Sequence, residues 1–319
     1  MTHTNAELAA EAIHELLKKT SLTDQEVELL ACATASADQI LPSHASMVHG
    51  KLKNKPMEIF SSSGICLTCL QAFKIACLSI QCGEKQNAVC SCSELASPGL
   101  LSKNYDIEYE KCNDLGVTPY MALEKDFLRF MLSDASSAVL LQDAPLANKS
   151  LLVEWVDMTS YANEAGTCMA MGGEHTEDGE LKSWKAFSGQ ELVDRSLMAV
   201  RQDIKLLEKK VIPLWIRHIE ECLAKHHLSA GDITYVIPHV SSMFFWNKLI
   251  DGLQEKGINL KEEQFYTNLT RVGNIASAAI FSALDEFMQT HELHSGETIL
   301  LLVPESGRFS YGSVLLSVV

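Results

Sequence analysis

The stretch Phe60-Ser-Ser-Ser-Gly-Ile-Cys66-Leu-Thr-Cys69-Leu-Gln-Ala-Phe73 places a run of small residues directly before an apolar segment. This order predicts a strand that ends in small residues and turns into a helix beginning near Cys66. A helix N-terminus carries positive partial charge and unpaired N–H groups, which lower the pKa of a thiol and favour the nucleophilic thiolate. Cys66 is therefore a candidate nucleophile, with a buried helix cysteine as the alternative.

An internal repeat extends outward from this stretch. Helical patterns over residues 5–20 and 211–226 each lead through a turn into a short apolar strand, and Val27 and Ile233 in these strands lie 206 positions apart.

The repeat continues further along each half. Helices are expected after Gly64 and Gly273, and the strand that follows each of them ends at Glu94 and Glu305, 211 positions apart. The offset between matched residues of the two halves changes by only a few positions, which indicates that the halves share one order of elements.

Helices that alternate with short apolar strands indicate mostly parallel sheets covered by helices. The repeat therefore predicts an α/β protein with two pseudo-symmetric halves, residues 1–150 and 151–319, and a shared cleft between them. The alternative is the chance similarity that any α/β protein can show. Residues 98–130 and 158–185 break the repeat, and we expect them to be insertions near one rim, where substrate pockets are often shaped.

Composition excludes several classes of protein. Hydrophobic residues make up 47% of the 319 residues and charged residues 21%, which excludes a disordered chain. A net charge of −15 argues against nonspecific binding to nucleic acid. We find no secretory signal and no apolar run near the roughly 20 residues that span a bilayer, so we expect a soluble cytoplasmic protein without a membrane partner.

The ten cysteines are expected to be free thiols in a reducing compartment. Cys66 and Cys69 form a C-x-x-C motif, but no second pair with accompanying histidines completes a zinc site. We therefore expect no metal.

Four motifs occur in order along the chain. They are Ser62-Ser-Gly-Ile-Cys66 with its following helix and strand, Val236-Ile-Pro-His239, Arg271-Val-Gly-Asn274-Ile-Ala-Ser-Ala and Ser306-Gly307-Arg-Phe-Ser-Tyr-Gly312-Ser. They resemble, respectively, the nucleophile region, the strand ending in Pro-His, the Gly-Asn helix start and the glycine-rich oxyanion loop of the β-ketoacyl-ACP synthase III family of thiolase-fold condensing enzymes. The resemblance covers nearly the whole chain and implies a thiolase-like fold with the layers α-β-α-β-α.

The resemblance also implies a reaction: decarboxylative Claisen condensation of an acyl thioester with a malonyl- or β-ketoacyl-carrier protein, in fatty acid or secondary metabolite synthesis. Cys66 would hold the acyl group as a thioester and divide one difficult step into two. His239 and Asn274 would donate hydrogen bonds to the thioester oxygen of the malonyl unit as it loses carbon dioxide. The backbone N–H groups of Cys66 and Gly307 would form the oxyanion hole.

Simpler explanations exist for single residues: His239 as a structural histidine at a strand end, and Asn274 as a helix N-cap. The alternative functions are acyl transfer or thioester hydrolysis without condensation, and a non-catalytic subunit of a heterodimeric synthase. No resident cofactor is expected, since acyl-CoA or acyl-carrier protein would serve as substrate.

By the same resemblance we expect a homodimer that pairs across its axis at residues 57–60, with Leu41 reaching into the partner's acyl pocket. Lys209 and Lys210 would dock acyl carrier protein, with solvated lysines as the alternative.

The chain departs from the family pattern in three places. Phe244 stands where the family has an arginine that helps to hold phosphopantetheine, and Arg308 stands where it has a glycine. The chain also begins beyond the family's first strand, helix and loop. We therefore expect a central strand to be missing from the N-terminal sheet and the enzyme to be incompletely competent.

Overall fold

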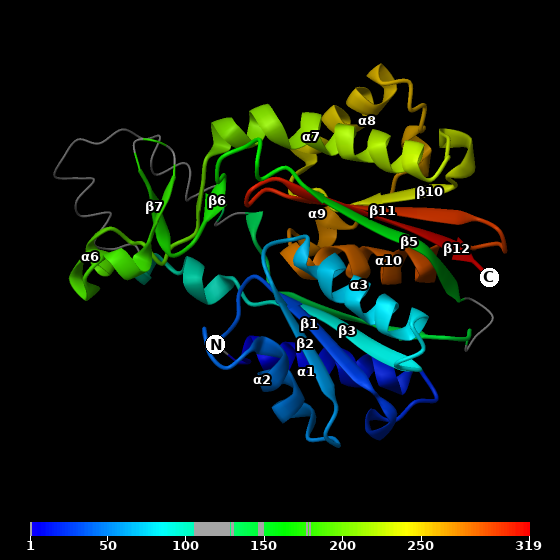
Figure 1. The fold of residues 1–319 in the computed structure, drawn as a ribbon, viewed down its shortest axis with the longest axis horizontal. Helices are drawn as coiled ribbons and strands as arrows, with labels where there is room; N and C mark the ends of the chain where they lie inside the picture. The colour runs from blue at the N-terminus through cyan, green and yellow to red at the C-terminus, as the bar shows by residue number, and fades with distance from the viewer. Residues whose placement is uncertain (1, 105–127, 129–130, 146–149, 177, 179) are drawn as a thin grey trace.

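The chain forms five stacked layers of helices and sheets, which Figure 1 shows edge-on. A computed structural model describes residues 2–104, 128, 131–145, 150–176, 178 and 180–319. An N-terminal sheet and a C-terminal sheet enclose a central layer of helices, and further helices cover the outer face of each sheet. This confirms the predicted thiolase-like α-β-α-β-α arrangement.

The N-terminal sheet has the strand order β2-β1-β3-β4. Its strands are β1 (Leu29–Thr34), β2 (Glu58–Ser63), β3 (Asn87–Glu94) and β4 (Ala135–Gln142). The first three run parallel, and β4 runs antiparallel to β3. Every residue of β1 and β3 is buried, because these inner strands lie between two layers of helices.

The C-terminal sheet has the order β10-β11-β12-β5. Its strands are β5 (Leu151–Ser160), β10 (Tyr235–Pro238), β11 (Thr298–Glu305) and β12 (Ser310–Val318). Since β12 runs antiparallel to both β11 and β5, three strands point one way and β12 the other. The boundary predicted at residue 150 falls between β4 and β5.

The helices occupy three layers. The outer N-terminal layer is α1 (Asn5–Lys18) and α2 (His44–Leu52), the central layer is α3 (Thr68–Gln81) and α10 (Ala279–Thr290), and the outer C-terminal layer includes α7 (Ile204–Lys225) and α8 (Trp246–Glu255). In the central layer the rings of Phe73 and Phe281 lie 5.2 Å apart, so α3 and α10 pack against each other between the sheets. Shorter helical segments are α6 (Gly189–Asp194), α9 (Leu269–Val272), η1 (Asp24–Glu26), η2 (Ser97–Leu100), η3 (Ser102–Asn104), η4 (Trp184–Ala186), η5 (Ala230–Asp232), η6 (Met243–Phe245), η7 (Glu262–Gln264) and η8 (Ala276–Ala278).

The two halves repeat one order of elements. In each half an outer helix leads through a 3₁₀ turn into a strand, α1 to β1 and α7 to β10. A central helix then leads into a second strand that pairs parallel with the first, α3 to β3 and α10 to β11, and an antiparallel strand, β4 or β12, follows. This confirms the pseudo-symmetry inferred from the sequence.

Two expectations about elements are wrong. The middle of the N-terminal sheet is filled by β1 and β3, so no central strand is missing from it. In the other half, β5 lies at the edge beside β12, so the matching position in the N-terminal sheet is the edge beside β4. The helix expected from residue 211 begins at Ile204, because the Asp203 carboxylate accepts the N–H of Leu206 at 2.9 Å and caps an earlier turn.

The segment between β5 and α7 forms a lobe beside the layers, at the left of Figure 1. It contains two small antiparallel pairs, β6 (Met169–Ala170) with β9 (Arg201–Gln202) and β7 (Gly173–His175) with β8 (Leu181–Ser183). This agrees with the insertion expected over residues 158–185, although β5 continues to Ser160. Most of the other expected insertion, residues 98–130, lies outside the described residues.

Candidate active site

Cys66 lies in the turn between β2 and α3, two residues before the helix begins. It is a free thiol whose residue is 7% exposed. Burial raises the pKa of this thiol, the carboxyl groups of Glu305 and Glu94 raise it further, and its own N–H lowers it. The expected lowering of the Cys66 pKa is therefore wrong for the free protein, because burial and two carboxyl groups outweigh the helix.

Cys69 is one turn further into α3 and is buried. Its Sγ donates to the carbonyl oxygen of Cys66 at 3.0 Å, which ties the Cys66 turn to the helix. This contact gives the second cysteine of the C-x-x-C motif a structural role.

Gly307 lies in the loop between β11 and β12, packed against the Cys66 turn. A Cβ atom on Gly307 would stand 2.8 Å from Cδ1 of Ile65, so a larger residue here would push the two loops apart. The carbonyl oxygen of Gly307 accepts from the N–H groups of Cys168 (2.8 Å) and Met169 (3.2 Å), which fix the orientation of the loop. Among the described residues, no backbone oxygen accepts from the N–H of Cys66 or from the N–H of Gly307. Both N–H groups remain available to an oxyanion.

His239 directly follows β10. Its N–H donates to the carbonyl oxygen of Leu302 on β11 at 2.8 Å, which extends the pairing of the two strands past Pro238. The residue is 5% exposed, and burial lowers the pKa of the ring to about 4, so the imidazole is neutral near pH 7. Its Nε2 is buried without a hydrogen-bond partner among the described residues. Buried polar atoms are rarely left unpaired, so this nitrogen is a candidate for contact with a ligand.

Asn274 is 3% exposed and is held by its own loop. Its backbone N–H donates to Met131 (3.2 Å), and its carbonyl oxygen accepts from Ser133 (2.9 Å). The side-chain Oδ1 accepts from the N–H of Ala276 at 3.0 Å, which fixes the amide so that its other end is Nδ2. No described residue accepts from Nδ2, so this group is left as a free donor.

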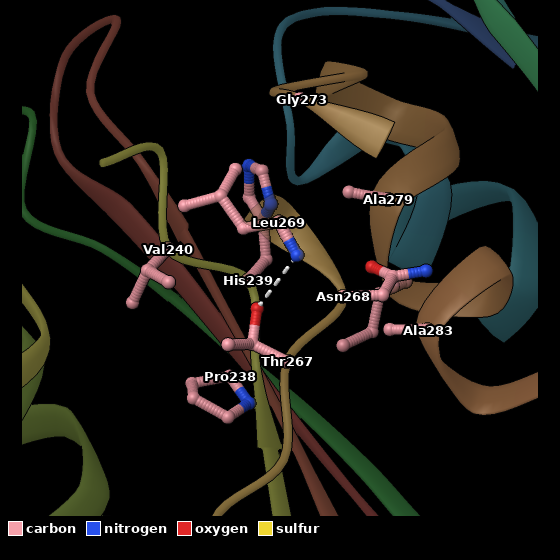
Figure 2. Close-up of a pocket in the computed structure, with 10 residues that line it drawn as sticks. Pro238, His239, Val240, Thr267, Asn268, Leu269, Gly273, Ala279 and Ala283 are labelled. Atoms are coloured by element: carbon pink, nitrogen blue, oxygen red, sulfur yellow. Dashed lines mark hydrogen bonds between the residues drawn. The ribbon is translucent and has the colours of Figure 1, made fainter. Parts of the chain in front are cut away.

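The loops that carry these residues are connected through β11 and one small cavity. Ile65, beside Cys66, donates its N–H to Glu305 at the end of β11, and His239 is bonded to Leu302 on the same strand. His239 and Gly273, the neighbour of Asn274, line the same cavity, shown in Figure 2.

Two glutamates near Cys66 received no role in the sequence prediction. Glu94 is 2% exposed, and its carboxylate accepts from the hydroxyl and N–H of Ser277 on η8. Glu305 accepts from the N–H of Ile65 at 3.3 Å. Their matched places in the repeat are the one sequence signal that could have pointed to them.

The remaining predicted residues lie on the surface. Leu41 is 82% exposed in the single chain, Phe244 is 55% exposed, and Lys209 is an exposed residue of α7 with Lys210 half-buried beside it. Arg308 is also exposed, and its Nε donates to the carbonyl oxygen of Ala165 at 3.3 Å, so its guanidinium is held at the surface.

The described residues contain no group of three or more His, Cys, Asp or Glu side chains placed to hold a metal ion. In the described part of the chain, no helix combines the length and the apolar character needed to cross a bilayer.

Comparison with known proteins supports the assignment of the fold. Residues 223–318 match the family model for the C-terminal part of 3-oxoacyl-[acyl-carrier-protein] synthase III. Solved structures that are similar include 3-oxoacyl-[acyl-carrier-protein] synthase III from Aquifex aeolicus (TM-score 0.70, 21% identity, 99% of this chain and 85% of that one), the tetronic acid condensing enzyme AbyA1 (0.75, 19%, 99% and 87%) and a variant of Xanthomonas campestris OleA (0.79, 17%, 99% and 81%).

Relatives in sequence extend over the same length. β-Ketoacyl-[acyl-carrier-protein] synthase III of Chlamydia caviae is 23% identical over 316 residues, which is 97% of this chain and 81% of that protein. The enzyme of the same name from Clostridium perfringens is 24% identical over 316 residues, with 98% and 84% covered. The chain therefore has the thiolase-like fold of these condensing enzymes and is similar in sequence to β-ketoacyl-ACP synthase III over nearly its whole length.

Proposed function

We propose that this protein is an acyltransferase that joins an acyl thioester to a malonyl- or β-ketoacyl-carrier protein by decarboxylative Claisen condensation. The acyl group moves first onto Cys66, with release of the donor's thiol. The malonyl unit then loses carbon dioxide, and the resulting enolate attacks the acyl-Cys66 thioester, which frees the cysteine. Both the acyl-CoA and the carrier protein are substrates, and no resident cofactor takes part.

The buried, unpartnered Nε2 of His239 is the observation that carries this proposal. A neutral imidazole with its proton on Nε2 donates a hydrogen bond without adding a charge to the pocket, and the Nδ2 group of Asn274 is a second free donor. Two donors aimed at an enolate oxygen stabilise the negative charge that develops as carbon dioxide leaves. The N–H groups of Cys66 and Gly307 suit the oxyanion of the acyl-transfer steps.

Carrier-protein docking, dimerisation and cellular location complete the proposal. The exposed Lys209 with Lys210 beside it offers positive charge to an acidic carrier protein. Leu41, exposed in the single chain, would extend into the acyl pocket of a second copy in a homodimer. We place the enzyme in the cytoplasm.

The test is release of labelled carbon dioxide from malonyl-carrier protein in the presence of an acyl-CoA. Substituting His239→Ala or Asn274→Ala is expected to lower the rate by about 100-fold or more, since single oxyanion donors typically contribute that much. His294→Ala, at an exposed histidine, is the matched control and is expected to leave the rate unchanged. Rates that stay within about twofold in both site variants would contradict the proposal.

Acyl transfer or thioester hydrolysis without condensation remains the second candidate. It predicts that Cys66 is acylated while no carbon dioxide is released from any malonyl donor. The exposed Phe244, at the place of the family's phosphopantetheine-binding arginine, offers no charge to a phosphate in either candidate, so release of carbon dioxide is the result that separates them.

A further inference from the structure

Two glutamates at matched positions of the repeat each reach into the other half of the molecule. Glu94 ends β3 and accepts from Ser277, close to Asn274 along the chain. Glu305 ends β11 and accepts from Ile65, next to Cys66. Each carboxyl group therefore holds the loop that carries a candidate catalytic residue of the opposite half.

The surroundings of the two carboxyl groups differ. Glu94 accepts from the N–H of Ala35 (3.0 Å), the hydroxyl of Ser36 (2.6 Å) and the hydroxyl of Ser277. These hydrogen bonds stabilise its carboxylate. Among the described residues, Glu305 accepts only from backbone N–H groups, those of Ile65 and Leu67. No described lysine, arginine or histidine forms an ion pair with Glu305.

The Glu305 carboxyl lies between the Cys66 turn and the oxyanion loop. Its Oε2 is 3.6 Å from the place that a Cβ atom on Gly64 would take, and its Oε1 is 3.5 Å from the corresponding place on Gly307. The carboxyl group therefore contacts both the turn that carries Cys66 and the loop that carries Gly307.

We propose that Glu305 is a positioning residue which fixes the Cys66 turn against the oxyanion loop and whose negative charge keeps Cys66 a neutral thiol in the free enzyme. This inference rests on the function proposed above. During acylation the thiol proton then leaves with the departing thiolate of the acyl donor, so that the donor is released as a free thiol and the charge of the site does not change. The free enzyme would thereby resist alkylation and oxidation of its nucleophile.

Electrostatics at the site agree with this proposal. After burial, the charge of Glu305 is the largest cause that raises the pKa of Cys66, and the charge of Glu94 is the next. The titratable groups that act on Cys66 and Cys69 are Glu305 of β11, Glu94 and Cys90 of β3 and, for Cys69, Cys66 itself, and no described cation offsets them. Burial raises the pKa of Glu305 itself, and the N–H groups of Ile65 and Leu67 act against this by favouring the charged form that the proposal requires.

The test is the rate at which iodoacetamide alkylates Cys66 as a function of pH, read from the mass of the peptide that contains it. Glu305→Gln keeps a hydrogen-bond acceptor but removes the charge, so the midpoint is expected to fall by about one pH unit, with alkylation about tenfold faster at pH 7.5. Glu305→Asp keeps the charge and is expected to follow the wild type. Glu292→Gln, at an exposed position, is the neutral control.

A midpoint in Glu305→Gln that is unchanged or higher would overturn the proposal. If Cys66 reacts too slowly in every variant, thiolate absorbance at 240 nm gives the same midpoint, as the difference between each protein and its Cys66→Ala counterpart. Neither readout needs turnover. A shifted midpoint without any condensation would therefore uphold the role of Glu305 and refute the proposed function instead.

Discussion

His218 shows how burial sets the protonation state of a single residue in this fold. It lies on α7 without any exposed surface, and its Nε2 is 3.1 Å from the hydroxyl of Ser313 on β12. Burial lowers the pKa of the ring to about 4 from an ordinary value of 6.5. Between pH 4 and pH 6.5 the ring of His218 is therefore protonated in the unfolded chain and neutral in the folded protein.

This difference predicts a loss of stability in acid. The stabilisation is fully present above pH 6.5 and is lost as the pH falls toward 4, by up to about 3 kcal/mol for this one ring. His218→Asn removes the titrating group while keeping a polar partner for Ser313. In urea titrations at pH 7 and 4.5, the variant is expected to lose about 2 kcal/mol less of its free energy of unfolding than the wild type. Equal losses in both proteins would contradict this account.

Single residues were predictable to different degrees. Cys66, His239, Asn274 and Gly307 stand in short local motifs, so the sequence could nominate them. The contact between Glu305 and Ile65 joins residues 240 positions apart, and no local pattern reports such a pairing. The predicted direction of the Cys66 pKa shift failed for the same reason, because the shift depends on burial and on two carboxyl groups that the fold brings in.

At the scale of elements, the packing of β12 against α3 joins the C-terminal sheet to the central layer. Gly312 on β12 allows this close approach, since a Cβ atom there would stand 2.5 Å from Cδ1 of Leu67 and 2.8 Å from Cδ1 of Leu70. Both leucines are fully or almost fully buried and have little room to move.

Gly312→Ala is therefore expected to destabilise the protein by about 1–3 kcal/mol through overpacking. Gly50→Ala is the matched control: Gly50 lies within α2 with nothing near its added Cβ, so the helix propensity of alanine should stabilise it by up to about 1 kcal/mol. Chemical unfolding of both variants measures the two effects. A neutral or stabilising result at Gly312 would refute this description of the interface.

The elements themselves were largely predictable, because helical and strand patterns repeat at nearly constant offsets. The repeat locates β1, β3, β10 and β11, each of which follows a helix along the chain. It does not reveal β4 or β12, whose antiparallel pairing depends on neighbours in the sheet. It also places the start of α7 too late, because the repeated pattern covers residues 211–226 and the helix begins at Ile204.

At the scale of the whole molecule, two exposed apolar side chains beside α2 indicate that the chain forms a dimer. Ile40 is 73% exposed and Leu41 82% exposed in the single chain, and β2 is an edge strand of its sheet. Light scattering is expected to give a mass of about 70 kDa, twice the 35.2 kDa of one chain. Leu41→Asp is expected to change the preferred acyl chain length and to leave the fold of each protomer intact. A monomer mass at micromolar concentration would contradict the dimer.

The central claim is that Cys66 carries the acyl group, and peptide mass mapping tests it most directly. The protein is incubated with acyl-CoA donors from acetyl to lauroyl, denatured and digested. The account predicts one acyl group, on the peptide that contains Cys66, and its disappearance in Cys66→Ala. An acyl label that persists in that variant, or a wild-type protein that stays unlabelled with every donor and with acyl-carrier protein, would contradict the account.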